Sequence, residues 1–299
     1  MSATKRERFG LSCALTTPIN AQGEPDLARF ARHARWTLDN GCQTVTAFGT
    51  TGEGAALSLA QRAAMLGALQ GIGIPGHQIN LGIAASSMGE ALDQARMGID
   101  HGCRYQMVCP PFYFKGVSDE GLYVWFSRFI EALGAKCLPI ILYHIPSVTS
   151  VPLSSELIGR LKKAFPGVIA GVKDSSCEWP TQERLLKDHA KDLAILVGGE
   201  RLLARSVREG GEGSICGVAN LAPGWLRPMV DKGVEDPRIN ALVDLICHYP
   251  VIPAVKALVG KMNNDPGFAA MLPPLDALPD ADRAKLFAGF DRVMEAKAA

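Results

Sequence analysis

The sequence lacks the features that commit a chain to a membrane, to export or to a polyanionic partner. Its longest apolar run, residues 137–145, is far shorter than the roughly 20 residues that a membrane-spanning helix needs. The charged residues at 5–8 are followed only by a short apolar stretch, which is not the core of a signal peptide. The 31 Lys and Arg residues nearly balance the 30 Asp and Glu residues. We therefore expect a cytoplasmic protein that binds neither a membrane nor a nucleic acid.

Motifs for disulfides, metals and nucleotides are also scarce. The eight cysteines form no C-x-x-C pair, which suits free thiols in a reducing compartment. The six histidines show no paired spacing, so Glu53, His144 and Asp174 are the remaining candidates for a metal site. The G-x-G-x-x-G run at 71–76 follows an expected helix and precedes an expected strand, the reverse of the dinucleotide-binding order. We expect no metal and no cofactor.

Short apolar runs alternate with longer helical patterns along most of the chain. The expected strands are 11–17, 44–48, 79–84, 105–109, 139–143, 168–173, 193–197 and 213–217. The expected helices between and after them are 26–40, 59–71, 88–101, 119–134, 153–165, 180–190 and 200–209. Eight such units predict the α/β class and a (β/α)8 TIM barrel. An open, doubly wound sheet is the alternative, because the number of strands does not prove closure.

The last quarter of the chain has a helical pattern without strands. Helices are expected at 238–248, 252–262 and 281–297, and Pro273, Pro274 and Pro279 break the chain before the last one. We therefore expect a barrel over 1–221 that carries the active site. A C-terminal helical extension over 222–299 would pack on it.

The expected strand at 168–173 ends in a lysine. Because side chains alternate along a strand, Ile169, Gly171 and Lys173 share one face, and Lys173 points into the barrel mouth, where active groups of barrels gather. An ammonium that loses its water there gives up a proton more readily, and the neutral amine can attack a carbonyl carbon. The alternatives are a lysine that reaches solvent or one that forms a buried ion pair with a residue such as Glu53.

Tyr143 ends the neighbouring expected strand as Lys173 ends the next one. Neighbouring strands lie about 4.8 Å apart, so the phenol and the amine can approach each other. A tyrosine hydroxyl both donates and accepts a hydrogen bond, which suits a proton relay. The alternative is a core tyrosine whose hydroxyl is bonded by the backbone.

Two glycine-rich loops follow expected strands. Glycines at 49, 52 and 54 let backbone N–H groups turn toward a ligand, and the hydroxyls of Thr50 and Thr51 add donors. Such a loop favours a carboxylate or a phosphate. Gly199 and Glu200 follow the seventh expected strand, where they are also candidates to receive an anion. A tight turn is the alternative for the first loop, and a hydroxylated substrate tail is the alternative ligand for the second.

Four motifs occur in a specific order. They are Gly-Thr-Thr-Gly-Glu at 49–53, Pro-Pro-Phe-Tyr at 110–113, Tyr-His-Ile-Pro at 143–146 and Gly-Val-Lys-Asp at 171–174. This combination resembles the dihydrodipicolinate synthase and N-acetylneuraminate lyase family of class I, Schiff-base pyruvate aldolases. The resemblance covers most of the chain, from residue 10 to residue 221.

The resemblance implies an imine between Lys173 and the keto carbon of pyruvate or another 2-oxo acid, with Tyr143 as acid and base. Thr50 and Thr51 would hold the pyruvate carboxylate, and one of their hydroxyls would link Tyr143 to Tyr113. In family members the residue that matches Tyr113 reaches into a neighbouring subunit's site, which implies a homodimer or homotetramer. The covalent imine requires no cofactor.

The resemblance indicates less about the rest of the substrate. Ile215 would line the pyruvate side, and Gly199 and Arg201 lie where a substrate tail could bind, with a solvated Arg201 as the alternative. Dihydrodipicolinate synthases typically carry an arginine after the strand-five tyrosine, where this chain has Val148, and losing that carboxylate partner is not a conservative change.

We therefore predict a lyase that cleaves or condenses a 2-oxo acid or dehydrates a 2-oxo-3-deoxy acid. Dihydrodipicolinate synthase, which joins pyruvate to aspartate semialdehyde, is the first alternative. A barrel that only binds a 2-oxo acid and a metal-dependent aldolase are the others.

Overall fold

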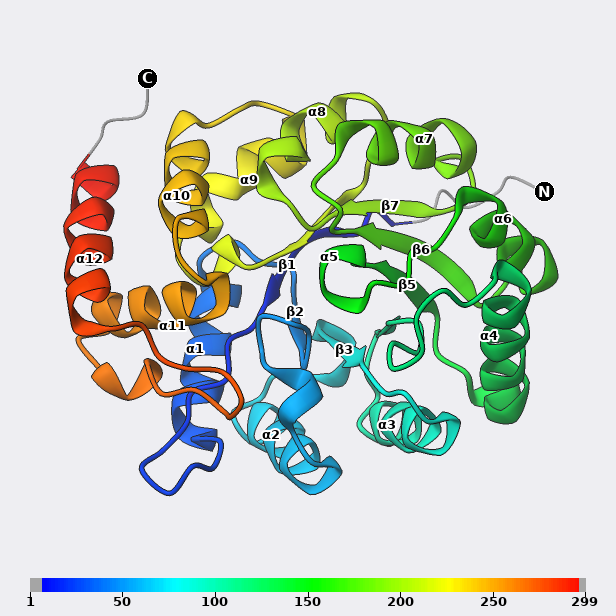
Figure 1. Ribbon diagram of the computed structural model, residues 1–299, viewed down its shortest axis with the longest axis horizontal. Coiled ribbons are helices and arrows are strands. Elements are labelled where there is room, and N and C mark those ends of the chain that lie inside the picture. Colours follow the sequence, from blue (N-terminus) through cyan, green and yellow to red (C-terminus); the bar gives the residue numbers. More distant parts are fainter. Residues whose placement is uncertain (1–6, 296–299) are drawn as a thin grey trace.

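Eight parallel strands close into a ring in the computed structural model, which describes residues 7–295 (Figure 1). Each strand pairs with the next one along the chain, and the last returns to pair with the first. The strands are β1 Gly10–Ala14, β2 Thr44–Ala47, β3 Ile79–Ile83, β4 Tyr105–Val108, β5 Ile140–His144, β6 Ile169–Asp174, β7 Ala194–Val197 and β8 Gly213–Cys216. The ring confirms the TIM barrel and rules out the open sheet, because an open sheet would leave two edge strands.

Helices surround the ring on the outside (Figure 1). They are α1 Leu27–Asp39, α2 Leu59–Gly71, α3 Met88–Asp100, α4 Asp119–Leu133, α6 Ser155–Ala164, α7 Trp179–His189, α8 Leu203–Arg208 and α9 Pro223–Lys232. Local chemistry sets their ends: Ser58 and Gln61 form a reciprocal capping box before α2, and Gly41 after α1 has a φ of 128°. A short helix that the sequence did not predict, α5 Pro146–Thr149, follows β5.

The C-terminal part forms three more helices on one side of the ring (Figure 1). These are α10 Pro237–Cys247, α11 Val251–Met262 and α12 Asp280–Glu295, and they confirm the helical extension. The predicted end of the last helix, residues 296–297, lies outside the described residues. Helix α9 packs on β1 and β8 as the eighth helix of the ring although it follows residue 221, so the division into 1–221 and 222–299 stays a prediction.

Helix α11 is buried along most of its length. It buries the unbroken run 253–260, which contains a lysine, Lys256. Within residues 7–295 no single helix has the length and apolarity to cross a bilayer, and only α10 and α11 together, bent by 118°, meet that test by length and composition.

Strand β6 departs from simple alternation near its start. Ile140 and Ile141 of β5 pair with Ile169 and Gly171, so Ala170 is an extra residue in β6. Ile169 packs in the core between sheet and helices, whereas Ala170 packs against the cluster inside the barrel. The expectation that Ile169 shares a face with Gly171 and Lys173 is therefore wrong, because the extra residue reverses the alternation before Gly171.

A buried histidine joins the first helix of the ring to the segment after β8. The Nε2–H of His33 donates to Asn220 Oδ1 (2.9 Å), and Asn220 Nδ2 donates to the carbonyl of Ala14 at the end of β1 (2.7 Å). Burial lowers the pKa of His33 from 6.5 to about 4, and the Asn220 contact opposes that shift only partly. The folded protein therefore holds this imidazole neutral where the unfolded chain would protonate it.

We expect this histidine to make stability fall with acidification. Because its folded pKa lies below its unfolded pKa, the unfolded chain binds the proton first, and the contribution is lost as the pH falls from about 6.5 to about 4. The slope is up to about 1.4 kcal/mol per pH unit. Urea unfolding of the wild type and of His33→Gln at about pH 7.5 and about pH 5 measures it. Equal losses in the two proteins would contradict the assignment.

Candidate active site

Lys173 and Tyr143 face each other across the pair formed by β5 and β6. Both side chains are buried: Lys173 is 4% exposed and Tyr143 is 3% exposed. The Nζ of Lys173 lies 4.3 Å from the centre of the Tyr143 ring. The structure therefore brings the amine and the phenol together where the strands finish, as their positions in the sequence predict.

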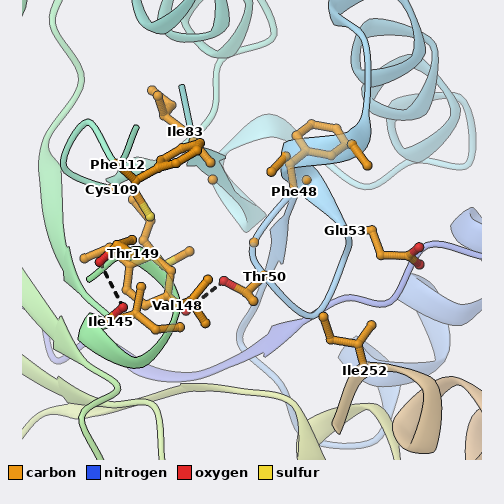
Figure 2. A pocket seen from close by; sticks show the side chains of 18 of the residues that line it. Phe48, Thr50, Glu53, Ile83, Cys109, Phe112, Ile145, Val148, Thr149 and Ile252 are labelled. Carbon is orange, nitrogen blue, oxygen red and sulfur yellow. Dashed lines mark hydrogen bonds between the residues drawn. The ribbon is translucent and has the colours of Figure 1, made fainter. Parts of the chain in front are cut away.

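The loop after β2 places Thr50 against Tyr143. The Oγ1 of Thr50 and the hydroxyl oxygen of Tyr143 are 3.3 Å apart and hydrogen-bonded (Figure 2). The loop is tight, since Phe48 and Glu53 have φ values of 63° and 55°, which are unfavourable for residues other than glycine. Gly54 is required here, because a Cβ at this position would lie 1.9 Å from the carbonyl oxygen of Phe48.

A buried arginine of the surrounding helix layer supports this loop. Arg62 of α2 is 1% exposed and donates to the carbonyl oxygens of Gly54 (2.6 Å) and Gly82 (3.0 Å). Its guanidinium also lies 5.1 Å from the centre of the Phe48 ring. Burial lowers the pKa of Arg62 to about 10. The charge remains in place at neutral pH and holds the end of the loop against β3.

A buried ion pair supports the same loop from the C-terminal extension. The Nζ of Lys256 donates to Oε1 of Glu53, and the backbone N–H of Leu272 donates to Oε2 (2.6 Å). Both charged side chains are fully buried. Burial lowers the pKa of Lys256, and the charge of Glu53 opposes that shift. Because Glu53 has these partners, the alternative in which it pairs with Lys173 is wrong.

A cavity of about 490 Å³ lies beside Tyr143 and Thr50 (Figure 2). This size is within the range of small-molecule sites. Its walls are mainly the loops that follow β2 to β5, and the extension closes one side. The lining residues are Phe48, Gly49, Thr50, Glu53, Gly54, Ala55, Ala56, Gly82, Ile83, Ala84, Met107, Cys109, Phe112, Tyr143, Ile145, Val148, Thr149, Ile252, Pro273, Pro274 and Leu275.

Two further predicted residues belong to the β8 side of the mouth. Ile215 is fully buried in the apolar cluster inside the barrel that also contains Tyr143. Thr51 stands beside the segment after β8, since a Cβ at Gly217 would lie 3.6 Å from Thr51 Oγ1. The structure thus places Tyr143 beside Lys173 and Thr50 against Tyr143, while Ile215 shares the apolar cluster of Tyr143 and Thr51 lies beside Gly217.

Three predicted residues lie apart from this group in the single chain. Tyr113 is 73% exposed, and its ring packs edge-on against Phe114 with a centroid distance of 5.2 Å. Gly199 contributes to the loop after β7 and does not line the cavity. Arg201 forms an ion pair with Asp244 of α10, so a substrate contact by Arg201 requires that it leave this partner and stays a prediction.

The loop after β7 contains a buried carboxyl group of its own. Glu200 is 7% exposed, and its Oε1 accepts a hydrogen bond from the backbone N–H of Val218 (2.9 Å). Burial raises the pKa of Glu200, while the Val218 hydrogen bond and the positive charge of Lys173 oppose that shift. A buried acidic side chain is an unfavourable neighbour for an anion, and the expectation that this loop receives one stays a prediction.

The three residues considered for a metal do not meet. The nearest approach of His144 to Asp174 is 3.9 Å, and Asp174 accepts hydrogen bonds from the backbone and hydroxyl of Ser176. Burial raises the pKa of Asp174 and lowers that of His144, so both are pushed toward their neutral forms. Glu53 is bound by Lys256, and no group of three or more possible ligands occurs within residues 7–295.

Sequence reasoning missed the contribution of the extension. Lys256, Ile252 and Leu275 all lie after the last strand, yet they support or line the cavity. One signal for Lys256 was available: it is a lone charge within the apolar run 251–260 of an expected buried helix. A charge at such a position needs a buried partner.

Comparisons with known proteins agree with this geometry. Residues 8–286 match the family described as Dihydrodipicolinate synthetase family. An uncharacterized DapA-like lyase of Chloroflexus aurantiacus is 30% identical over 300 residues, which cover 96% of this chain and 98% of that protein.

Solved structures share the fold. The crystal structure of dihydrodipicolinate synthase from Agrobacterium tumefaciens C58 is 46% identical, has a TM-score of 0.94 and aligns over 96% of this chain and 100% of that chain. YagE, a family member from E. coli K12 in complex with pyruvate, is 19% identical with a TM-score of 0.85 over 96% of this chain and 99% of that chain, and it shows the fold alone. The chain belongs to the dihydrodipicolinate synthetase family and is a class I lyase of the aldolase type.

Proposed function

We propose that Lys173 forms a Schiff base with pyruvate or a related 2-oxo acid and that the enzyme makes or breaks a carbon–carbon bond next to it, or dehydrates a 2-oxo-3-deoxy acid. The observation that carries the proposal is the cluster of a buried amine, the Tyr143 ring at 4.3 Å and the Tyr143 to Thr50 hydrogen bond at 3.3 Å. All three groups lie at the mouth of the barrel, where barrel enzymes perform their chemistry.

The chemistry needs only protons, water and the two reactants. The neutral amine of Lys173 attacks the keto carbon, a carbon–nitrogen bond forms, and the keto oxygen leaves as water. The protonated imine then accepts the electron pair from a C–H bond of the methyl group, which loses a proton and gives an enamine. The enamine carbon attacks an aldehyde carbon, whose oxygen takes up a proton, and water finally releases the product and the amine. Cleavage is the same path in reverse.

Tyr143 and the threonines fit the remaining tasks. Tyr143 would carry protons to and from the departing oxygen, with Thr50 holding its hydroxyl in place. Thr50 and Thr51 would bind the carboxylate, because the loop commits the N–H groups of Gly52, Glu53 and Gly54 to its own carbonyls. Ile215 would pack against the pyruvate unit from β8.

Intact-mass spectrometry after incubation with pyruvate and borohydride tests this proposal. Borohydride reduces the imine to a stable amine, so we expect one pyruvate-derived adduct per chain, and peptide mapping should place it on Lys173. An adduct on another lysine would overturn the assignment. If pyruvate gives no adduct, and 2-oxo-3-deoxy sugar acids give none in the same procedure, the Schiff-base proposal fails.

Tyr143→Phe should retain packing but lose proton transfer. The ring beside Lys173 is kept and only the hydroxyl bonded to Thr50 is removed, so we expect kcat to fall by roughly 10²- to 10⁴-fold with little change in the thermal midpoint. Tyr123→Phe on α4 is the matched control, because the Tyr123 ring packs against the guanidinium of Arg160 in the helix layer. Equal kcat values for Tyr143→Phe and the wild type would show that the hydroxyl takes no part.

Dihydrodipicolinate synthase activity is a second candidate. The Agrobacterium tumefaciens structure of that name, at 46% identity, favours it. Val148, which is 60% exposed at the cavity mouth, stands where such enzymes are expected to place an arginine, and this disfavours it. Turnover of pyruvate with aspartate semialdehyde, compared with other aldehydes, decides between the two.

We also propose a homodimer or homotetramer. The exposed aromatic pair of Tyr113 and Phe114, each 73% exposed, is the feature that supports a contact between subunits. Light scattering after size-exclusion chromatography gives the mass directly. A monomer at working concentration would leave Tyr113 without a neighbouring site to enter.

A further inference from the structure

We propose that the group bound beyond the pyruvate unit is uncharged and apolar, of the size of an aromatic ring, rather than a carboxylate or a polyhydroxylated chain. The inference rests on the proposed Schiff-base function and adds the chemical class of the second substrate. It follows from the lining of the cavity beside Tyr143, from the compensation of the charges near it and from the elements that form its walls.

The walls of the cavity are mainly apolar. Phe48, Phe112 and Tyr143 contribute aromatic rings, and most of the other large lining residues are aliphatic or contain sulfur (Figure 2). These others are Ile83, Met107, Cys109, Ile145, Val148, Ile252 and Leu275. Burial raises the pKa of Cys109 to about 12, so its thiol adds no charge at neutral pH. Such walls stabilise a group that leaves water without needing hydrogen bonds.

The single charge among the described lining residues is already compensated. Glu53 lines the cavity, but both of its carboxylate oxygens accept hydrogen bonds from the extension, from Lys256 and from Leu272. In Figure 2 its carboxylate points away from Thr50. A substrate carboxylate in the cavity would therefore meet Glu53 without meeting a free cation on the lining.

An exposed lysine that contacts the lining residue Phe112 and the hydroxyl of a second lining threonine are also engaged. The Nζ of Lys115 donates to the carbonyls of Phe112 and Thr149, which joins two of the loops behind the cavity wall. The hydroxyl of Thr149 donates to the carbonyl of Ile145 (3.0 Å) and accepts from the N–H of Val151 (3.2 Å). Both groups brace the loops, so neither is directed at a ligand.

This arrangement disfavours polar substrates because the walls offer few groups for hydrogen bonds. A carboxylate or a chain of hydroxyl groups that entered the cavity would lose hydrogen bonds to water and regain few from the walls, which is costly for each group. Among the described lining residues of the cavity, Tyr143 and Thr50 are the ones whose hydroxyls lie toward the reacting end. An apolar group loses nothing comparable and gains contact with Phe48 and Phe112.

Aldehyde competition measures this preference. Pyruvate is supplied with benzaldehyde, succinic semialdehyde or glyceraldehyde, and the aldol product is quantified by mass spectrometry. We expect kcat/KM for benzaldehyde to exceed both others by at least about tenfold, a modest preference for a difference in buried polar groups. A higher kcat/KM for either polar aldehyde overturns the inference, and so does the absence of any aldol product.

The pyruvate adduct distinguishes a failure of the apolar subsite from a failure of the Schiff-base function. An adduct on Lys173 together with a preference for polar aldehydes leaves the Schiff-base proposal standing and removes the apolar subsite. Without any adduct the Schiff-base function itself fails, whatever the aldehyde.

Val148→Arg tests the same wall from the protein side. A guanidinium at this half-exposed position would pair with a carboxylate and interrupt the apolar wall. We expect the ratio of kcat/KM for benzaldehyde to that for succinic semialdehyde to fall at least about tenfold. Val234→Arg is the matched control, because Val234 is 53% exposed and does not line the cavity. If both variants keep the wild-type ratio, Val148 does not contribute to an apolar subsite.

Discussion

Lys173→Ala should give no borohydride-trapped pyruvate adduct and should lower kcat by at least about 10³-fold. The expectation follows from position: Lys173 is 4% exposed at the barrel mouth with its Nζ 4.3 Å from the centre of the Tyr143 ring. Removing the amine removes the atom that bonds to the keto carbon, so no protonated imine can stabilise the carbanion. Because Lys173 lies at the end of β6, the truncated side chain leaves the barrel pairing intact.

A surface lysine provides the control for this experiment. Lys187→Ala on α7 removes an exposed lysine outside the cavity and should trap pyruvate as the wild type does. Circular dichroism and the thermal midpoint establish that Lys173→Ala is folded. A folded Lys173→Ala protein that still carries the adduct, or that turns over at the wild-type rate, would refute the assignment of this lysine as the nucleophile.

Lys256→Met should destabilise the fold by about 3–5 kcal/mol, the range found when one partner of a buried ion pair is removed. The ammonium of Lys256 and the carboxylate of Glu53 are both fully buried. Methionine keeps an unbranched side chain of similar length but leaves Glu53 with an uncompensated charge in the interior. Denaturant unfolding followed by fluorescence or circular dichroism gives the difference.

Two further variants show whether the loss comes from the unpaired charge. Adding Glu53→Gln to Lys256→Met removes that charge and should restore at least half of the lost stability, since an amide is far cheaper to bury than a carboxylate. Lys261→Met, on the same helix as Lys256, breaks the partly exposed pair with Asp291 of α12, and we expect a loss of less than about 1 kcal/mol there. Equal losses of stability at positions 256 and 261 would mean that burial does not determine the contribution of the Lys256–Glu53 pair.

The same pair connects stability to the site. Glu53 ends the loop that carries Thr50, and Lys256 belongs to α11, so a loss of the pair releases the loop from the extension. We expect Lys256→Met to raise KM for pyruvate more than it lowers the yield of trapped adduct at saturating pyruvate. This split distinguishes a positioning role from a role in bond making.

Local pattern was sufficient for the succession of βα units and for the approach of two candidate site residues. Alternating apolar runs and capped helices predict eight βα units, and the barrel has them in order. Because the carboxyl ends of parallel strands share one edge, residues that end neighbouring strands must lie close together. Tyr143 and Lys173 lie one residue before the ends of β5 and β6 and pair in register, so their approach was determined by the sequence without knowledge of the tertiary structure.

Other features depended on contacts between distant parts of the chain. The extra residue Ala170 in β6 arises from pairing with β5, and strand periodicity carries no sign of it. Glu53 and Lys256 are 203 residues apart in the sequence, and no local pattern around either residue indicates that the two form a pair. Arg201 likewise pairs with Asp244, which is distant in the sequence, and the local sequence could not indicate this contact.

The shape and polarity of the cavity were decided in the same way. Ile252 and Leu275 close a space whose other walls come from loops before residue 150. The sequence by itself determined the eight βα units and the approach of Lys173 to Tyr143, because these depend on periodicity and on strand ends, whereas closure of the ring depends on the pairing of β1 with β8. The tertiary structure alone decided which charges are paired and which walls surround a substrate, because burial and long-range packing are properties of the whole fold.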